Sequence, residues 1–132
     1  MKTALWWIRR DLRLGHNVAL GAALENAERV IPVFVLDPTL LRSPYLSQKR
    51  FAFILGGLRA LDVALRERGS RLVIRSGPPH RELPRLLHET KAEAVYCEHD
   101  VSPYSRKRDV WLKASIPLKG VWGLSYLSPT QA

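Results

Sequence analysis

The chain has 132 residues, a length that suits one domain, and 46% of them are hydrophobic, which is enough to form a core. Its 21 basic and 12 acidic residues give a formal net charge of +9, which permits nucleic-acid or phosphate partners without demonstrating them. No apolar run could span a bilayer, the opening run is too short for a signal-peptide core, and the single cysteine excludes an internal disulfide, so we expect a cytoplasmic domain.

The predicted elements alternate between strand and helix from the N-terminus onward. Residues 3–8 form an apolar run that charged residues end, which indicates a buried strand. Asn17 is a typical N-cap residue, and the apolar spacing behind it predicts a helix over residues 18–28. Residues 30–36 are rich in β-branched side chains and favour a strand, in which Pro32 suits an edge or the first residues better than a central position.

The clearest predicted element is a long helix over residues 47–68, whose leucines recur at helical spacing. Inside it, Gly56 and Gly57 are a weak point that allows a neighbour to approach closely, and Gly69 ends the helix. The later elements are a strand at 71–75, a helix with Pro84 in its first turn, a strand at 94–97, a helix opened by Ser102 and Pro103, and a strand at 118–122.

This βαβαβαβαβ order predicts an α/β fold, a Rossmann-like three-layer sandwich with a five-stranded parallel sheet and helices on both faces. In such sheets ligands bind beyond the carboxyl ends of the strands, where the strand order reverses. Those ends carry Arg9-Arg10-Asp11, Asp37-Pro38, Ser76-Gly77 and Glu98-His99-Asp100. We therefore expect candidate ligand contacts along this edge of the sheet.

Several familiar motifs are absent from the sequence. There is no GxGxxG after the first strand and no GxxxxGK[ST], which argues against a dinucleotide fingerprint and a P-loop. There is also no CxxC pair and no HExxH, and the four histidines lack metal-ligand spacing. The sequence therefore predicts no metal site and offers no catalytic residues by spacing.

Two stretches concentrate charge at predicted strand ends. The first, residues 7–20, places three arginines and Asp11 in the loop after the first strand. A guanidinium can fork onto a carboxylate or a phosphate, so these residues either pin the loop through an Arg–Asp pair or form the rim of a binding site. In the second stretch, residues 96–109, Arg106 and Asp109 are spaced to pair on a helix, and Asp100 is placed to accept hydrogen bonds from a ligand.

These stretches resemble the signatures of the DNA photolyase and cryptochrome family. W-I-R-R-D-L-R-L followed by N-V-A-L is similar to the family's opening, and P-Y-S-R-K-R-D is similar to its later signature. Between them, Val35–Pro38, Lys49–Ile54 and Gly77–Pro79 match further family segments in order. The resemblance covers nearly the whole chain and identifies it as the family's N-terminal α/β domain.

The resemblance implies a function that belongs to a longer protein. Family members join this domain to a helical domain that holds FAD, and light-excited reduced FAD donates an electron to a pyrimidine dimer flipped out of duplex DNA. The N-terminal domain carries a light-harvesting pigment that passes its excitation to FAD. In these terms residues 1–132 are the antenna domain of a deoxyribodipyrimidine photolyase, a light-dependent carbon–carbon lyase. We expect residues 1–132 to lack the helical FAD domain, DNA to be a partner only through the full-length protein, and the isolated chain to be inactive.

The sequence is similar to the deazaflavin-type cyclobutane pyrimidine dimer photolyases, so the implied pigment is 8-hydroxy-5-deazaflavin or FMN rather than a folate. Carried over by motif position, the cofactor contacts are Arg9, Asp11, Phe34, Val35, Arg50 and Asp100. Phe34 and Val35 would form an apolar wall for a flat ring, with Arg50 as donor and Asp100 as acceptor at its polar edge. Ser102 departs from this pattern, because such relatives carry an acidic residue there.

Alternative functions remain on the same fold. A cryptochrome-like photoreceptor domain differs from a photolyase in residues of the absent helical domain. A stand-alone nucleotide- or flavin-binding module without repair activity is a second alternative, although the missing phosphate-cradling glycines argue against a nucleotide. A face that packs on the helical domain in the family would be bare here, which leaves self-association open.

Overall fold

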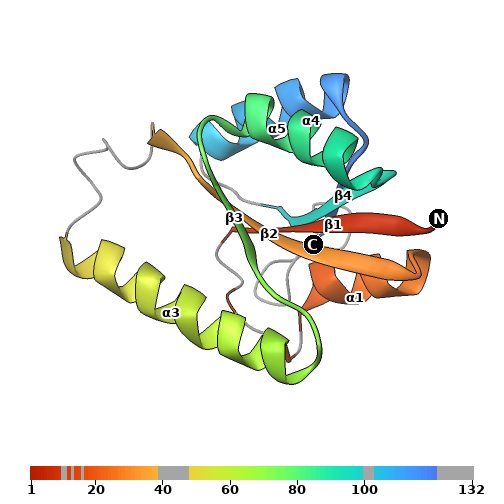
Figure 1. Ribbon diagram of the computed structural model, residues 1–132. Coiled ribbons are helices and arrows are strands. Elements are labelled where there is room, and N and C mark those ends of the chain that lie inside the picture. The colour runs from red at the N-terminus through yellow and green to blue at the C-terminus, as the bar shows by residue number, and fades with distance from the viewer. Residues whose placement is uncertain (10–11, 13, 16, 39–47, 100–102, 122–132) are drawn as a thin grey trace, which may run out of the picture.

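In the part of the chain that the structure describes, five parallel strands form one sheet, and two helices cover each of its faces (Figure 1). The computed structural model describes residues 1–9, 12, 14–15, 17–38, 48–99 and 103–121. The strands are β1 (Thr3–Ile8), β2 (Arg29–Leu36), β3 (Val73–Ser76), β4 (Ala94–Glu98) and β5 (Leu118–Val121). The helices are α1 (Val18–Asn26), α3 (Gln48–Glu67), α4 (Pro79–Thr90) and α5 (Pro103–Ser115). The predicted Rossmann-like three-layer fold is confirmed.

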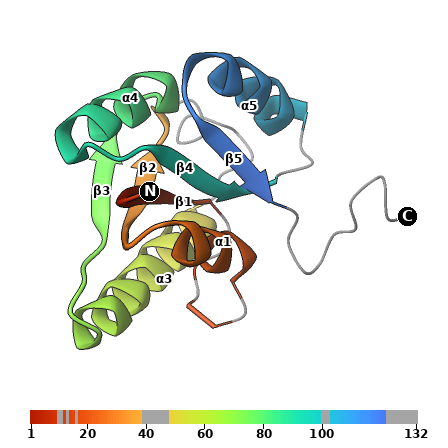
Figure 2. The ribbon, with the colours of Figure 1, turned by 90° about the vertical axis from the view of Figure 1, so that its right-hand side faces the viewer.

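The strand order is β3-β2-β1-β4-β5, so the chain starts at the centre of the sheet and builds outward in both directions. The order reverses between β1 and β4, which pair over residues 4–6 of β1. Figure 2 shows the consequence: α1 and α3 lie on one face of the sheet, and α4 and α5 lie on the other. The carboxyl ends of β1 and β4 therefore form the switch point at which doubly wound sheets bind ligands.

The side chains of β1 alternate between two cores. Leu5 and Trp7 pack in the cluster under α4 and α5, whereas Trp6 and Ile8 pack in the cluster against α1 and α3. All four side chains are at most 2% exposed. A strand covered on both faces needs a continuous apolar run, and this requirement explains why β1 is visible in the sequence.

Pro32 lies within β2, an interior strand, yet it occupies a local edge. β2 pairs with β1 at Pro32, but its pairing with β3 begins only at Val33. At Pro32 the strand therefore has a neighbour on one side only, which is where a residue without an N–H is tolerated.

Two predictions about the helices differ from the structure: the position of Pro84 in α4 and the role of the glycine pair in α3. α4 begins at Pro79, so Pro84 is its sixth residue and not part of its first turn, and the helix accepts the loss of one backbone hydrogen bond there. In α3, a Cβ on Gly57 would lie 2.9 Å from Leu12 Cδ1, whereas a Cβ on Gly56 would have no atom within 4 Å. The close approach expected of the pair is thus made by Gly57 alone.

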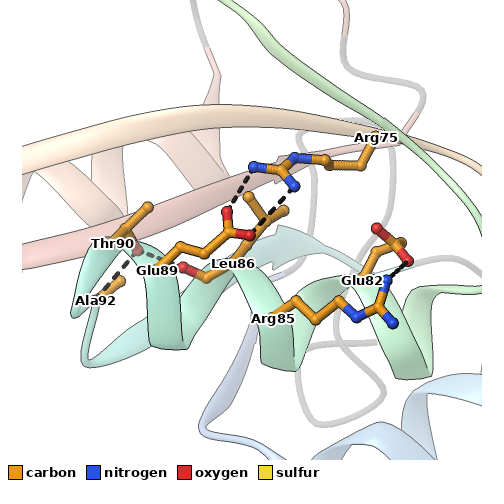
Figure 3. A network of polar contacts seen from close by, with 7 residues as sticks. All are labelled: Arg75, Glu82, Arg85, Leu86, Glu89, Thr90 and Ala92. Carbon is orange, nitrogen blue, oxygen red and sulfur yellow. Dashed lines mark hydrogen bonds and ion pairs between the residues drawn. The ribbon is translucent and has the colours of Figure 1, made fainter.

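Polar contacts tie α4 to β3 and close the C-terminus of the helix (Figure 3). Arg75 of β3 donates from both terminal nitrogens to the carboxylate of Glu89. The Thr90 hydroxyl donates to the carbonyl of Leu86 at 2.6 Å and accepts the N–H of Ala92 at 3.3 Å. Because the Arg75 and Glu89 side chains are 35% and 47% exposed, their ion pair contributes at most about 1 kcal/mol.

Candidate functional site

Arg9 follows β1 directly and lies at the switch point, where its side chain is only 6% exposed. Its Nη1 donates to the carbonyl oxygen of Glu98 at 3.1 Å and to Oδ2 of Asp109 at 2.8 Å. Glu98 ends β4 and Asp109 lies in α5, so one guanidinium joins the ends of the two central strands to a helix. The arginine predicted from the sequence therefore holds the ends of β1 and β4 against α5.

Two guanidinium groups lie over the indole ring of Trp7. The Cζ atoms of Arg9 and Arg108 each lie 4.9 Å from the centroid of the Trp7 ring. Trp7 is 2% exposed, and the Arg108 side chain is 11% exposed. Cation–π contacts that are shielded from water in this way are worth up to about 2 kcal/mol each.

A second carboxylate completes this group of charges. Arg108 Nη1 lies 3.6 Å from Oδ2 of Asp37, and its Nε lies 3.7 Å from Oδ1 of Asp109. The Asp37 side chain, which directly follows β2, is 2% exposed. We call Arg9, Arg108, Asp37 and Asp109 the Arg–Asp cluster. It holds two positive and two negative groups, and each needs the others because an unpaired buried charge costs several kcal/mol.

The Arg–Asp cluster contains residues that the sequence did not mark as site residues. The sequence suggested a pair within the loop after β1 or between Arg106 and Asp109, and the side chain of Arg106 lies outside the described residues. Asp109 contacts Arg9, a residue 100 positions away, and Arg108. No local sequence pattern predicts a contact between residues so far apart. Asp37 and Asp109 themselves do lie in recognisable motifs, D-P and R-x-R-D.

Of the predicted pigment contacts that the structure describes, Phe34 and Val35 do not lie on the same side of the sheet. Asp11 and Asp100 lie outside the described residues. Phe34 and Val35 face opposite sides of the sheet: Phe34 packs against the core under α1 and α3, and Val35 belongs to the core under α4 and α5. A flat ring lying on one face of the sheet therefore contacts only one of them, and the two do not form a single wall.

Arg50 lies in the first turn of α3 and is exposed. α3 covers the face of the sheet toward which Phe34 points, so Phe34 and Arg50 lie on the same side of the sheet. The side chain of Val35 points to the opposite side, into the core that also holds Trp7 and Cys97. The buried sulfur of Cys97 is 3.8 Å from Arg9 Nη1. The described candidates thus divide between the two sides of the switch point.

His99 follows β4 and lies over the adjacent edge strand. Its backbone N–H donates to the carbonyl of Val121 at 2.7 Å, and a Cβ on Gly120 would lie 2.5 Å from the imidazole Cε1. The ring therefore rests on the glycine backbone of β5. Burial lowers the pKa of His99, the carboxylate of Asp109 opposes this shift, and the positive charge of Arg9 reinforces it.

Among the residues that the structure describes, no three His, Cys, Asp or Glu side chains are grouped so that they could hold a metal ion. In that same part of the chain, no helix combines the length and the hydropathy needed to cross a membrane. The single cysteine, Cys97, is 1% exposed and is not in a disulfide.

These features define a doubly wound α/β domain whose switch point is braced by buried charge. The family model for DNA photolyase matches residues 4–126. The chain therefore belongs to the DNA photolyase family, and the resemblance noted in the sequence is confirmed.

Named relatives include photolyases and cryptochromes. The "Deoxyribodipyrimidine photo-lyase" of Synechococcus sp. (strain ATCC 27144 / PCC 6301 / SAUG 1402/1) is 37% identical over 132 residues, covering 96% of this chain and 27% of that protein. "Cryptochrome-1" of Spalax judaei is 33% identical over 127 residues, covering 96% of this chain and 22% of that protein. The crystal structure of an archaeal photolyase from Sulfolobus tokodaii, described with two FAD molecules, matches with a TM-score of 0.86 and 34% identity over 96% of this chain and 30% of that one. The chain thus spans between 22% and 30% of the length of these relatives.

The Arg–Asp cluster generates a prediction about stability. We expect Asp109→Ala to lower the free energy of unfolding by about 3 kcal/mol, because it leaves the charges of Arg9 and Arg108 without this buried partner. The matched control is Glu89→Ala, which removes the exposed partner of Arg75 and should cost at most about 1 kcal/mol. Urea unfolding followed by circular dichroism measures both variants, and equal losses would contradict the distinction between the two pairs.

The environment of His99 generates a prediction about pH. We expect its pKa to lie below the ordinary value of about 6.5, as measured by an NMR titration of the imidazole. Because the folded pKa is the lower one, the unfolded chain binds the proton more readily. The contribution of this residue to stability is therefore present above the unfolded pKa and is lost as the pH falls below about 6.5 toward the folded pKa. His99→Gln should lose less stability over that pH range than the parent chain, and a pKa of His99 above 6.5 would refute the effect of burial.

Proposed function

We propose that the chain is the N-terminal light-harvesting domain of a deoxyribodipyrimidine photolyase, which repairs pyrimidine dimers in DNA with light once it is joined to a helical FAD domain. The observation that carries this proposal is the family match over residues 4–126 together with the 37% identity to the Synechococcus photo-lyase. The repair activity, the DNA partner, the helical FAD domain and a cytoplasmic location are properties of the whole protein that the proposal adds.

The pigment in this proposal is of the flavin type, 8-hydroxy-5-deazaflavin or FMN, rather than a folate. Such a group supplies absorption of blue light and transfer of that excitation to FAD. The chemistry of the described residues suits it on the α3 side of β2, because Phe34 is aromatic and Arg50 carries exposed donors. The description of the archaeal relative, with two FAD molecules and "a novel light-harvesting cofactor", supports a flavin in that role.

The remaining candidates take different parts in this proposal. Asp11 and Asp100 would accept hydrogen bonds from the polar edge of the ring. The guanidinium of Arg9 is enclosed by protein groups, so we assign it the task of holding the ends of β1 and β4 in place. Val35 would support the strand from the opposite face of the sheet.

A cryptochrome-like photoreceptor is the second candidate function, favoured by the 33% identity to Cryptochrome-1 of Spalax judaei. The photolyase is preferred because its identity over the same share of the chain is 37%. The coding sequence downstream of Ala132 separates these functions from a stand-alone flavin-binding module. A continuing frame that encodes a helical FAD domain would support the first two, and a stop codon would support the third.

The isolated 132-residue chain should not repair DNA, because the proposal places the FAD site in the helical domain. The measurement is light-dependent repair of an oligonucleotide that contains a thymine dimer, with a complete photolyase as the positive control. Turnover by the isolated chain above a no-protein blank would overturn this assignment of the chemistry.

Binding of FMN by the same chain should be weak, with a dissociation constant above about 1 μM, because the proposal draws part of the pocket's cover from the helical domain. Phe34→Ala and Arg50→Ala should weaken binding further, and Val35→Ala, on the opposite face of the sheet, is the matched control. FMN fluorescence reports the affinity. A sub-micromolar affinity would contradict the need for a cover, and a loss in Val35→Ala as large as in Phe34→Ala would contradict the α3-side location.

A further inference from the structure

The side of α3 that points away from the sheet carries an exposed row of residues with a symmetric order. The inner side of the helix is buried through Leu58, Leu61 and Leu65, and Figure 1 shows α3 lying against one face of the sheet. The outer row, which we call the outer stripe, follows the helical spacing and is exposed at every position: Lys49, Phe53, Gly56, Ala60, Val63 and Glu67. Phe53 is 78% exposed and Val63 is 57% exposed.

The outer stripe is chemically complementary to its own reverse. Its centre is position 58, from which positions 56 and 60 are equidistant, as are positions 53 and 63 and positions 49 and 67. Reversal of the helix therefore brings small residues onto small ones, apolar onto apolar and basic onto acidic. A surface shaped for an unrelated partner has no need of this order, whereas two identical surfaces that meet across a two-fold axis do.

We propose that the outer stripe is a self-association surface, on which α3 of a second copy of this chain packs antiparallel across a two-fold axis. Each contact between the copies then occurs twice, and the pairs are Lys49–Glu67, Phe53–Val63 and Gly56–Ala60. The small pair at the crossing lets the two backbones approach closely, and the space above Gly56 is open, since a Cβ there would have no atom within 4 Å. The opposed helix dipoles favour the same direction.

Charge complementarity selects this arrangement over a parallel one. A parallel pair would bring Lys49 onto Lys49 and Glu67 onto Glu67, and like charges that face each other repel. On the flank of the stripe, Arg66 is held by Asp62 on the same helix, with Nε and Oδ2 2.9 Å apart. The net charge of +9 opposes association at low salt, so the interaction is measured at about 0.15 M salt, where the screening length is about 8 Å.

A single pair of helices forms a small interface, so a dissociation constant on the order of 10–100 μM is expected. Sedimentation equilibrium of the 132-residue chain up to several hundred micromolar, on the scale set by that estimate, measures it. Lys49→Glu and Glu67→Lys should each weaken dimerisation about 5- to 10-fold, because each places two like-charged pairs in the interface. The double variant Lys49→Glu/Glu67→Lys restores both opposite-charge pairs and should return to within about 3-fold of the parent.

Two controls change the net charge by the same amounts at exposed positions outside the stripe. Lys2→Glu is the control for Lys49→Glu, and Glu25→Lys is the control for Glu67→Lys. The two control variants should leave the dissociation constant of the dimer unchanged. Circular dichroism confirms that each variant is folded. A chain that stays monomeric throughout, as expected if the stripe is instead covered by another part of a longer family member, would overturn the proposal. So would a double variant as weak as the two single ones.

Discussion

The ion pair between Arg9 and Asp109 sets the geometry of the switch point. The same guanidinium donates to the carbonyl of Glu98 and lies over the indole of Trp7, so a single side chain connects β1, β4 and α5. Both charged groups are largely buried, with side chains 6% and 16% exposed, and the loss of either partner leaves a charge in a poorly solvated place. The exposed pair of Arg75 and Glu89 has no such consequence, because water can replace either partner.

The Arg–Asp cluster lies on the side of the sheet that α4 and α5 cover. Trp7 points toward α4 and α5, and Arg9, Arg108 and Asp109 fill the space at its edge. On that side the charged groups of Arg9, Arg108 and Asp109 face one another. The other side is lined by Phe34 and lies beneath α3, which is the reason for placing the proposed pigment there. Arg9, the first residue of the arginine-rich motif after β1, therefore has a direct structural role, because it links the ends of β1 and β4 to α5.

The sequence was sufficient for the features that depend on neighbouring residues. Predicted strand and helix ends agree within two residues where bounds were stated, Asn17 caps α1 by accepting the N–H of Leu20 at 2.9 Å, and Gly69 ends α3 with a φ of 80°. Contacts between distant residues could not be predicted, because Arg9 and Asp109 are 100 positions apart and no local pattern relates them. Phe34 and Val35 were expected from the sequence to form one wall, whereas they face opposite sides of the sheet, because the face that each side chain takes depends on how the helices pack.

α3 shows the difference between the constraints of folding and those of association. The inner leucines account for the position of the helix, since burial of their side chains is what holds it against the sheet. Folding sets no requirement on the outer stripe, where isolated apolar side chains are common on protein surfaces and need no explanation. The mirrored identities of the small, apolar and opposite-charge positions are different, because helix geometry accounts for their spacing but not for the pairing of residue types. The explanation for that order lies outside the monomer, in a partner that presents the same surface.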